Sequence, residues 1–243
     1  MAKIKSLCDL PQPLSLEGQP RVLVFVPHPD DESLGCGGTL ALLAEQSAVK
    51  VILVTDGSGA GGLPAGAVEV RRREFLAALA TLGVTDSEQW NYPDGAFFDT
   101  SGFQTKVQGL LKSYQPDWVM LPSPLDYHRD HLTVSVAVQS ACATSRKRLT
   151  RIYYEVWSPL PATHYLDITS VVDRKFQAVD CHQTALACGP YRSALMGLNA
   201  YRGLYRMDRE TPRFAEAFCV DPDGSFGEAL TAFALHMRGV SVI

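Results

Sequence analysis

The chain has no uninterrupted apolar run of the ~18 residues that a membrane-spanning helix requires. Its first twenty residues, MAKIKSLCDLPQPLSLEGQP, also lack the apolar core of a secretory signal. No internal repeat or low-complexity tract is present. We therefore expect a cytoplasmic protein that does not interact with a membrane.

Cysteine pairs and basic clusters are also scarce. The six cysteines are scattered and none forms a C-x-x-C pair, so the pattern indicates neither a thiolate zinc site nor a disulfide framework. Positive charge gathers only in two triplets, at residues 71–73 and 146–148, and the net charge is −4. Nucleic acid is therefore not expected as a partner.

What the chain does contain is an alternation of short apolar runs with helical patterns. β-Branched runs of this kind are typical of strands buried on both faces of a parallel sheet. The predicted strands lie at residues 21–27, 49–56, 117–123 and 151–157, and the helices between them at 37–46, 67–83, 103–115 and 131–144. This order predicts an α/β fold, a Rossmann-like three-layer sandwich with a mostly parallel sheet.

The domain organisation follows from length and composition. We expect residues 1–20, which hold three prolines, to form an extended lead-in, and residues 21–243 to form a single domain. The C-terminal third is irregular, with predicted helices at 171–186 and 190–206 and a strand at 216–220. The sequence leaves the oligomeric state open, and a homo-oligomer is compatible with it.

Polar side chains follow three of the predicted strands, where an open α/β sheet binds its ligand. They are His28, Asp30, Asp31 and Glu32 after the first strand, Asp56 and Gly57 after the second, and Asp126, His128, Asp130 and His131 after the third. We expect these residues to meet at one edge of the sheet.

The stretch HPDDE places one imidazole and three carboxylates within five residues. Such a cluster is costly to bury without a cation. Two histidines and a carboxylate from separate loops commonly hold a catalytic divalent ion, with zinc the first candidate and Fe(II) another. Asp30 and Asp31 point in different directions on an extended backbone, so one can bind the ion while the other faces the reacting water. Simple helix capping by these residues is the alternative.

Five motifs then occur in order over about residues 22–140. They are PHPDDESLGCGGTL, VTDG, VRRREFLAALATLGV, YPDG and DYHRDH. This set resembles the LmbE-like or PIG-L family of metal-dependent N-deacetylases, which act on amides of the N-acetylglucosamine type. The resemblance implies that His28, Asp31 and His131 bind zinc.

The resemblance also implies the catalytic roles. Asp30 would be the general base for the reacting water. His128 would polarise the carbonyl or stabilise the tetrahedral oxyanion, with protonation of the leaving amine as a further role open to it, and Asp130 would orient His128. These roles suit amide hydrolysis, because a metal can lower the pKa of a bound water from ~15.7 towards ~7 and the oxyanion needs a cation or donor.

Substrate contacts are less sharply indicated. The resemblance points to Arg71 as a side chain that binds hydroxyls or anions, with a solvated basic helix face as the alternative. Asp94 suits hydrogen bonds to sugar hydroxyls, or is simply a Pro-Asp-Gly turn residue. Tyr127, and Arg129 where the family often has proline, alter the rim of the pocket and leave the substrate open.

Three further residues, Lys175, His182 and Gln183, resemble a family element on the substrate side, or are polar residues of an amphipathic helix. Glu32 is predicted to be structural, and the glycines of SLGCGG are predicted to permit close packing.

The sequence thus predicts a zinc-dependent hydrolase that removes an acetyl or small acyl group from an amino-sugar conjugate, a small-molecule partner. Two alternatives stay open. One is an amidase for a thiol-sugar conjugate or another non-sugar amide, and the other is a non-catalytic sugar-binding protein with a relict site.

Overall fold

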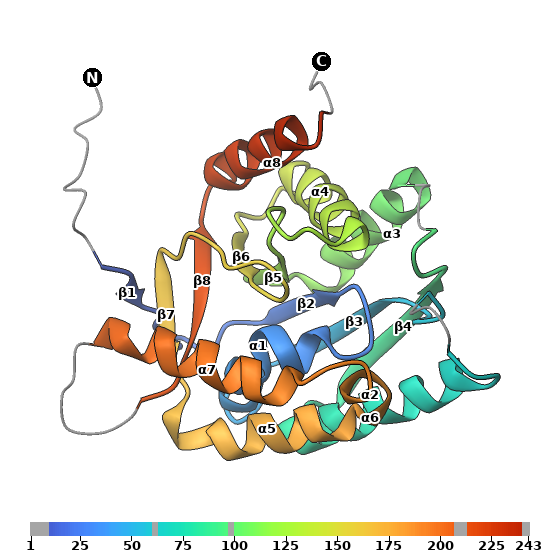
Figure 1. Ribbon diagram of the computed structural model, residues 1–243. Coiled ribbons are helices and arrows are strands. Elements are labelled where there is room, and N and C mark those ends of the chain that lie inside the picture. The colour runs from blue at the N-terminus through green and yellow to red at the C-terminus, as the bar shows by residue number, and fades with distance from the viewer. Residues whose placement is uncertain (1–9, 60–62, 97–99, 207–212, 240–243) are drawn as a thin grey trace.

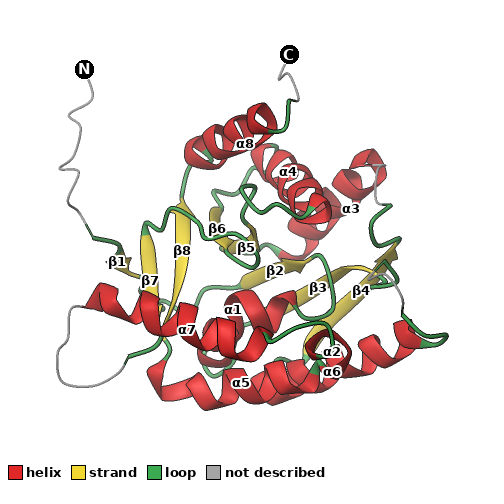
Figure 2. Ribbon diagram, in the orientation of Figure 1, coloured by secondary structure: helices red, strands yellow, loops and turns green. Residues whose placement is uncertain are grey.

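The computed structural model describes residues 10–59, 63–96, 100–206 and 213–239 (Figure 1). A single eight-stranded sheet, with the strand order β1-β7-β8-β6-β5-β2-β3-β4, forms the middle layer. Helices cover both of its faces (Figure 2). The predicted α/β sandwich is confirmed.

The strands are β1 (Gln12–Pro13), β2 (Val22–Val26), β3 (Val49–Thr55), β4 (Asp86–Tyr92), β5 (Trp118–Pro122), β6 (Thr150–Tyr154), β7 (His164–Asp167) and β8 (Ala215–Asp221). The α-helices are α1 (Asp31–Leu43), α2 (Ala67–Leu82), α3 (Thr100–Tyr114), α4 (Arg129–Ala143), α5 (Val172–Cys181), α6 (Gln183–Leu186), α7 (Tyr191–Gly203) and α8 (Ser225–Met237). Two 3₁₀ turns, η1 (Thr169–Val171) and η2 (Leu204–Arg206), complete the described elements.

The centre of the sheet is parallel. β2 pairs in parallel with β3 and β5, and all five of its residues are buried. β8 is the antiparallel strand between β6 and β7. β1 lies within the expected extended lead-in and pairs in parallel with β7. The parallel order brings the carboxyl ends of β2, β3, β5 and β6 to the same edge of the sheet.

Three described elements were not expected from the sequence. β4 reads DSEQWNY and is an edge strand with only Trp90 buried, so it lacks the apolar run that marks its neighbours. β7 has four residues, and α8 follows the predicted C-terminal strand. The predicted helix at 171–186 is divided into η1, α5 and α6, because the backbone leaves the helical region at His182.

Helix α1 begins at Asp31 instead of residue 37, and it is kinked at Cys36. The segment after the kink has its own acidic cap. The Glu216 carboxylate on β8 accepts hydrogen bonds from the backbone N–H groups of Gly38 and Thr39, each at 2.8 Å. The predicted start therefore matches this second segment, while the first turn holds the carboxylates of HPDDE.

Two glycines of α1 permit the close packing that SLGCGG predicts. A Cβ atom on Gly38 would lie 2.7 Å from the side chain of Ile168, and one on Gly35 would lie 2.5 Å from the ring of Tyr154. Any larger residue at either position would push α1 away from β6 or from the turn before α5. The position of HPDDE above the sheet depends on this fit.

One polar pair is buried beneath α1. Lys175 of α5 donates to Glu216 at 2.6 Å and to the carbonyl of Leu34 at 3.1 Å. Both charged side chains are at most 1% exposed. No helix in the described part of the chain is long and apolar enough to cross a membrane.

Candidate metal centre and active site

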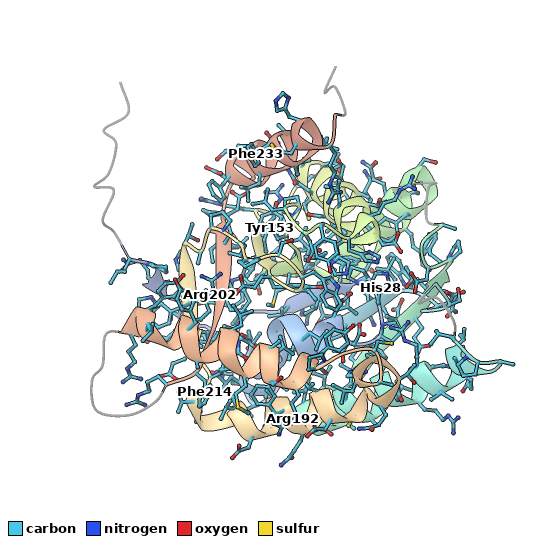
Figure 3. The ribbon with its side chains drawn as sticks, in the orientation of Figure 1. His28, Tyr153, Arg192, Arg202, Phe214 and Phe233 are labelled. Carbon is cyan, nitrogen blue, oxygen red and sulfur yellow. The ribbon has the colours of Figure 1, made fainter. Side chains whose placement is uncertain are left out.

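The candidate site lies at the carboxyl edge of the sheet, where His28 (labelled in Figure 3) follows the end of β2 and the loop after β5 leads into α4. His28 and Asp31 come from the β2–α1 loop and the first turn of α1. His131 comes from the first turn of α4, whose N-cap is His128. The polar clusters that follow separate strands in the sequence therefore meet in space, as predicted.

Three buried side chains place one ligand atom each at the corners of a nearly equilateral triangle. His28 Nδ1 lies 3.2 Å from His131 Nε2 and 3.3 Å from Asp31 Oδ2. Asp31 Oδ2 lies 3.2 Å from His131 Nε2. Zinc bond lengths of about 2.0–2.2 Å at tetrahedral angles require ligand atoms roughly 3.3–3.5 Å apart. The triangle therefore fits one small divalent ion with a further position free for water.

The pKa shifts of the three side chains also indicate that the carboxylates are stabilised by positive charge. Burial opposes a charged His28, but Asp130, Asp31 and Asp94 outweigh it and raise its pKa well above 6.5. Burial likewise opposes a charged His131, yet Asp31 and Asp126 raise its pKa to about 9. Despite burial, His131 and His28 lower the pKa of Asp31. Asp31 Oδ1 is buried without a hydrogen-bond partner. The carboxylates thus require positive charge among them.

Two other groups of three ligand atoms are close enough to hold an ion: His28, His128 and His131, and His28, Asp94 and Asp130. The second uses the opposite ring nitrogen of His28, Nε2, which lies 3.2 Å from both carboxylates. That contact is explained without a metal, because carboxylates commonly orient ligating histidines through the ring nitrogen that does not bind.

The structure gives Asp130 a partner other than the expected one. Its carboxylate lies against His28 Nε2 and accepts the N–H of Gly95 at 2.8 Å. Its link to His128 runs through the backbone, whose N–H donates to His128 Nδ1 at 3.3 Å. The reason is helical geometry: Asp130 follows the N-cap His128 by two residues, so its N–H caps while its side chain points elsewhere. The Asp130 carboxylate therefore contacts His28, not His128.

Asp126, to which the sequence analysis assigned no role, contacts a candidate ligand. Its Oδ2 lies 3.3 Å from Nδ1 of His131, and its carboxylate accepts the N–H groups of His128 at 3.0 Å and Trp157 at 2.9 Å. It is fully buried. The available signal was its position at the carboxyl end of a strand, five residues before a proposed ligand.

Asp30 lies outside the ligand triangle but lines the same cavity. Burial and the negative charge of Asp31 raise its pKa to about 7, against the opposing effect of Arg71. Arg71 Nη2 approaches Asp30 Oδ2 at 3.4 Å. A carboxylate with a pKa near neutrality can both take and return a proton, which is what a general base in hydrolysis requires.

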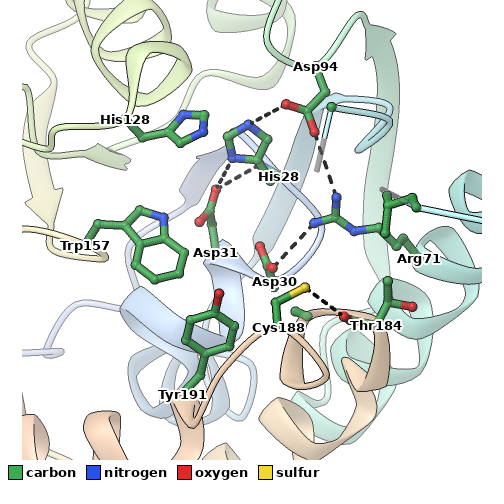
Figure 4. Close-up of a pocket in the computed structure, with 13 residues that line it drawn as sticks. His28, Asp30, Asp31, Arg71, Asp94, His128, Trp157, Thr184, Cys188 and Tyr191 are labelled. Carbon is green, nitrogen blue, oxygen red and sulfur yellow. Dashed lines mark hydrogen bonds and ion pairs between the residues drawn. The ribbon is translucent and has the colours of Figure 1, made fainter. Parts of the chain in front are cut away.

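Arg71 and Asp94 face this cavity from the side opposite Trp157 and Tyr191 (Figure 4). Arg71 is 5% exposed and donates to the carbonyl of Gly57 at 2.6 Å, so the alternative of a solvated basic face is wrong for this residue. Asp94 Oδ2 lies 3.8 Å from Arg71 Nη1. Both side chains are held by protein contacts and still line the cavity.

The cavity has a volume of about 140 Å³. His128 lines it, half-buried, and its ring packs edge-on against His28 at 4.5 Å between centroids. Burial, then the positive charges of His28 and His131, lower the pKa of His128. A neutral His128 that accepts the Asp130 N–H at Nδ1 carries its proton on Nε2. It is therefore a donor.

The remaining predicted residues lie outside the cavity. Glu32 Oε1 lies 2.7 Å from His182 Nε2 in a buried pair, as expected of a structural residue. Lys175 is paired with Glu216 below α1, and Gln183 donates to the carbonyl of Asp180. For all three late residues, the structure favours the alternative of polar helix residues over substrate contacts.

Comparison with known protein sequences agrees with this geometry. Residues 23–142, about half of the chain, match the model of the family described as PIG-L: GlcNAc-PI de-N-acetylase. An uncharacterized deacetylase, YaiS of Escherichia coli, is 30% identical over 131 residues, which is 51% of this chain and 68% of YaiS. A probable N-acetyl-α-D-glucosaminyl L-malate deacetylase 2 of Bacillus cereus is 27% identical over 71% of this chain and 82% of its own.

Two solved structures share the fold. N,N′-diacetylchitobiose deacetylase of Pyrococcus horikoshii has a TM-score of 0.77 at 23% identity, over 90% of this chain and 89% of its own. The 4-carboxy-2-hydroxymuconate hydratase GalB of Pseudomonas putida has a TM-score of 0.72 at 22% identity, over 82% and 95%. This fold therefore supports more than one reaction, and the argument for activity depends on the site. The family match and the sequence identity to YaiS show that the chain belongs to the PIG-L family of deacetylases.

Proposed function

We propose that this protein is a zinc-dependent N-deacetylase that hydrolyses the N-acetyl, or a similar small acyl, amide of an amino-sugar conjugate. The observation that carries the proposal is the triangle of His28, Asp31 and His131 with a separate carboxylate, Asp30, in the same cavity. Amide hydrolysis needs both a metal to activate water and a base to accept its proton. The family membership and the deacetylase relatives support the reaction type.

The ligand set suits the ion. Two imidazoles and one carboxylate are donors that zinc accepts, although Fe(II) also suits them. When bound, such an ion would lower the pKa of a coordinated water and polarise the amide carbonyl. Asp126 and Asp130 would hold the imidazole rings of His131 and His28 in the orientation that binding requires.

The residues of the chain then account for the proton movements. Asp30 accepts a proton from the attacking water, whose oxygen forms the new bond to the carbonyl carbon. Nε2–H of His128 donates a hydrogen bond to the oxygen on which negative charge develops. When the C–N bond breaks, Asp30, with a pKa of about 7, returns the proton to the leaving amine. Acetate and the free amine are the products.

Arg71 and Asp94 supply hydrogen-bonding groups for the sugar. Arg71 offers donors, and Asp94 accepts from a hydroxyl with the carboxylate oxygens that also contact His28 and Arg71. We propose a small amino-sugar conjugate as the partner and the cytoplasm as the location. An amidase for another amide would use the same ion and base, so substrate assays must separate the two.

The first experiment measures metal content and acetate release from N-acetylglucosamine and its conjugates, before and after chelation. We expect about one ion per chain and acetate release that chelation abolishes and zinc restores. Metal without acetate release would favour an amidase for another amide. Absence of metal after loading would contradict the ligand assignment.

An Asp30→Asn variant tests the mechanism separately. It should keep its metal and lose roughly 10²–10⁴-fold in kcat, the range for a general base. Asp86→Asn is a matched control, since Asp86 lies on the edge strand β4 with its side chain 51% exposed and paired with Lys50. Full activity in a metal-loaded Asp30→Asn protein would contradict the assigned mechanism.

A further inference from the structure

An unbroken row of three aromatic rings leads from the candidate active site to the surface. Tyr191 and Trp157 line the cavity, with ring centroids 5.1 Å apart and an angle of 70° between the planes. Trp157 in turn contacts Tyr127 at 6.3 Å and 43°. Tyr127 is 66% exposed, the most exposed ring of the three. Only the Tyr127 end of the row therefore lies outside the cavity.

The row is built into the metal centre. Asp126, which contacts the ligand His131, accepts the backbone N–H of Trp157 at 2.9 Å. The N–H of Tyr127 donates to Ser158 Oγ at 3.2 Å, so the loop after β5 is joined to the loop after β6. One buried carboxylate thus contacts both a proposed metal ligand and the backbone of Trp157, which holds the loops that carry Trp157 and Tyr127 close to the reacting centre.

The opposite side of the cavity is polar, with Arg71 and Asp94 facing Trp157 and Tyr191 across it (Figure 4). A pyranose matches such a pair of walls, because its hydroxyls lie at the ring edge and its C–H groups form apolar faces. An aromatic wall stabilises the C–H faces, while Arg71 and Asp94 bind hydroxyls. This accounts for the amino sugar itself but leaves Tyr127 without a role.

Tyr127 lies outside the cavity, so it can touch only a group that projects from the bound amino sugar. An exposed aromatic ring favours a neighbour that presents a flat apolar face and offers little to an acyclic carboxylic acid. We infer that Tyr127 and Trp157 form an outer subsite for a second pyranose ring, which makes the substrate a disaccharide or larger glycoside of N-acetylglucosamine. This inference rests on the proposed function and names its substrate class.

The kinetic test compares N,N′-diacetylchitobiose with free N-acetylglucosamine and with N-acetylglucosamine linked to malate, an acyclic acid. The zinc-loaded protein should show its lowest KM with the disaccharide. Tyr127→Ala should raise the KM for the disaccharide by about 2- to 10-fold, the range of one ring contact, and so lower its preference over the monosaccharide. Tyr127→Phe should keep that preference. Tyr201→Ala, which removes a 61% exposed ring on α7, is the control.

A binding test avoids dependence on turnover. In an Asp30→Asn background, titration with N,N′-diacetylchitobiose should change the tryptophan fluorescence, and Trp157→Phe should remove that change while Trp90 and Trp118 remain. A larger fluorescence change with the disaccharide than with the monosaccharide supports the inference.

The outcomes separate the two proposals. Acetate release with equal KM for monosaccharide and disaccharide overturns the subsite and leaves the deacetylase intact. A Tyr127→Ala effect that is the same for all three substrates also overturns it. No acetate from any substrate contradicts the proposed function. In that case the fluorescence titration still tests the outer subsite: a larger change with the disaccharide than with the monosaccharide supports it, and an equal change overturns it.

Discussion

Asp126→Asn tests how the metal centre is positioned. The substitution keeps the size of the side chain but replaces one oxygen by an NH₂ group. Asp126 makes three contacts, to Nδ1 of His131 and to the N–H groups of His128 and Trp157. All three partners present N–H groups to the carboxylate when His131 binds a metal through Nε2. An asparagine oxygen can satisfy one side only, so its NH₂ group must face at least one donor.

The magnitude follows from that mismatch. Loss of a carboxylate that orients a ligating histidine commonly costs 10- to 100-fold in metal affinity, equivalent to about 1.4–2.7 kcal/mol. Asp31 and His28, the two other ligands of the triangle, stay in place, so binding should weaken without being abolished. The Nδ1 contact at 3.3 Å is long for a hydrogen bond, which favours the lower half of the range.

The assay is competition for zinc between the protein and a chromophoric chelator of known affinity. Asp117→Asn is the control, because Asp117 lies at the opposite end of β5 with its side chain 48% exposed. Circular dichroism would establish that both variants are folded. An Asp126→Asn protein that is folded and binds zinc as tightly as the parent would refute the role of Asp126.

Two further predictions concern stability. Lys175→Met leaves the buried Glu216 carboxylate without its cation and should lower the free energy of unfolding, measured in urea, by about 3–5 kcal/mol. As a control, Arg72→Met breaks an exposed ion pair and should lower it by at most about 1 kcal/mol. Equal losses in the two variants would contradict this reasoning. Burial lowers the pKa of His182, but Glu32 outweighs it and raises the pKa above 6.5. The stabilisation by this pair is therefore complete below pH 6.5 and is lost as pH rises through the folded-state pKa, so the stability deficit of His182→Gln should shrink from pH 5 to pH 9. A deficit that grows with pH would argue against a charged His182.

Much of the fold could be read from local patterns. VLVFV is apolar throughout, and VKVILVT is apolar except for Lys50 and Thr55. Runs of this kind are typical of strands covered on both faces, so β2 and β3 and the sandwich around them follow from composition. β4 could not be read in this way, because an edge strand with exposed polar residues has no apolar pattern to detect. The start of α1 at Asp31 was also hidden, since DESLGCGG has no helical apolar stripe.

The candidate ligands could also be recognised from short sequence patterns. His28 and Asp31 are three residues apart and His131 follows a strand end, so short motifs of the sequence show which imidazole and carboxylate groups are available as metal ligands. What each carboxylate faces is a different matter. Asp130 is two residues from His128 in the sequence, yet its side chain lies against His28, 102 residues away.

The sequence by itself determined the strand and helix alternation, the edge of the sheet where polar residues gather, and the residue types of the candidate ligands, because each depends on neighbours along the chain. The resemblance to the PIG-L family implied the particular set His28, Asp31 and His131. Only the tertiary structure decided that Asp126 lies against His131, that Glu216 caps the second segment of α1, and that Tyr127, Trp157 and Tyr191 form one row. These contacts join loops far apart in the sequence. They are fixed by the packing of the sheet and its helices, which no single segment encodes.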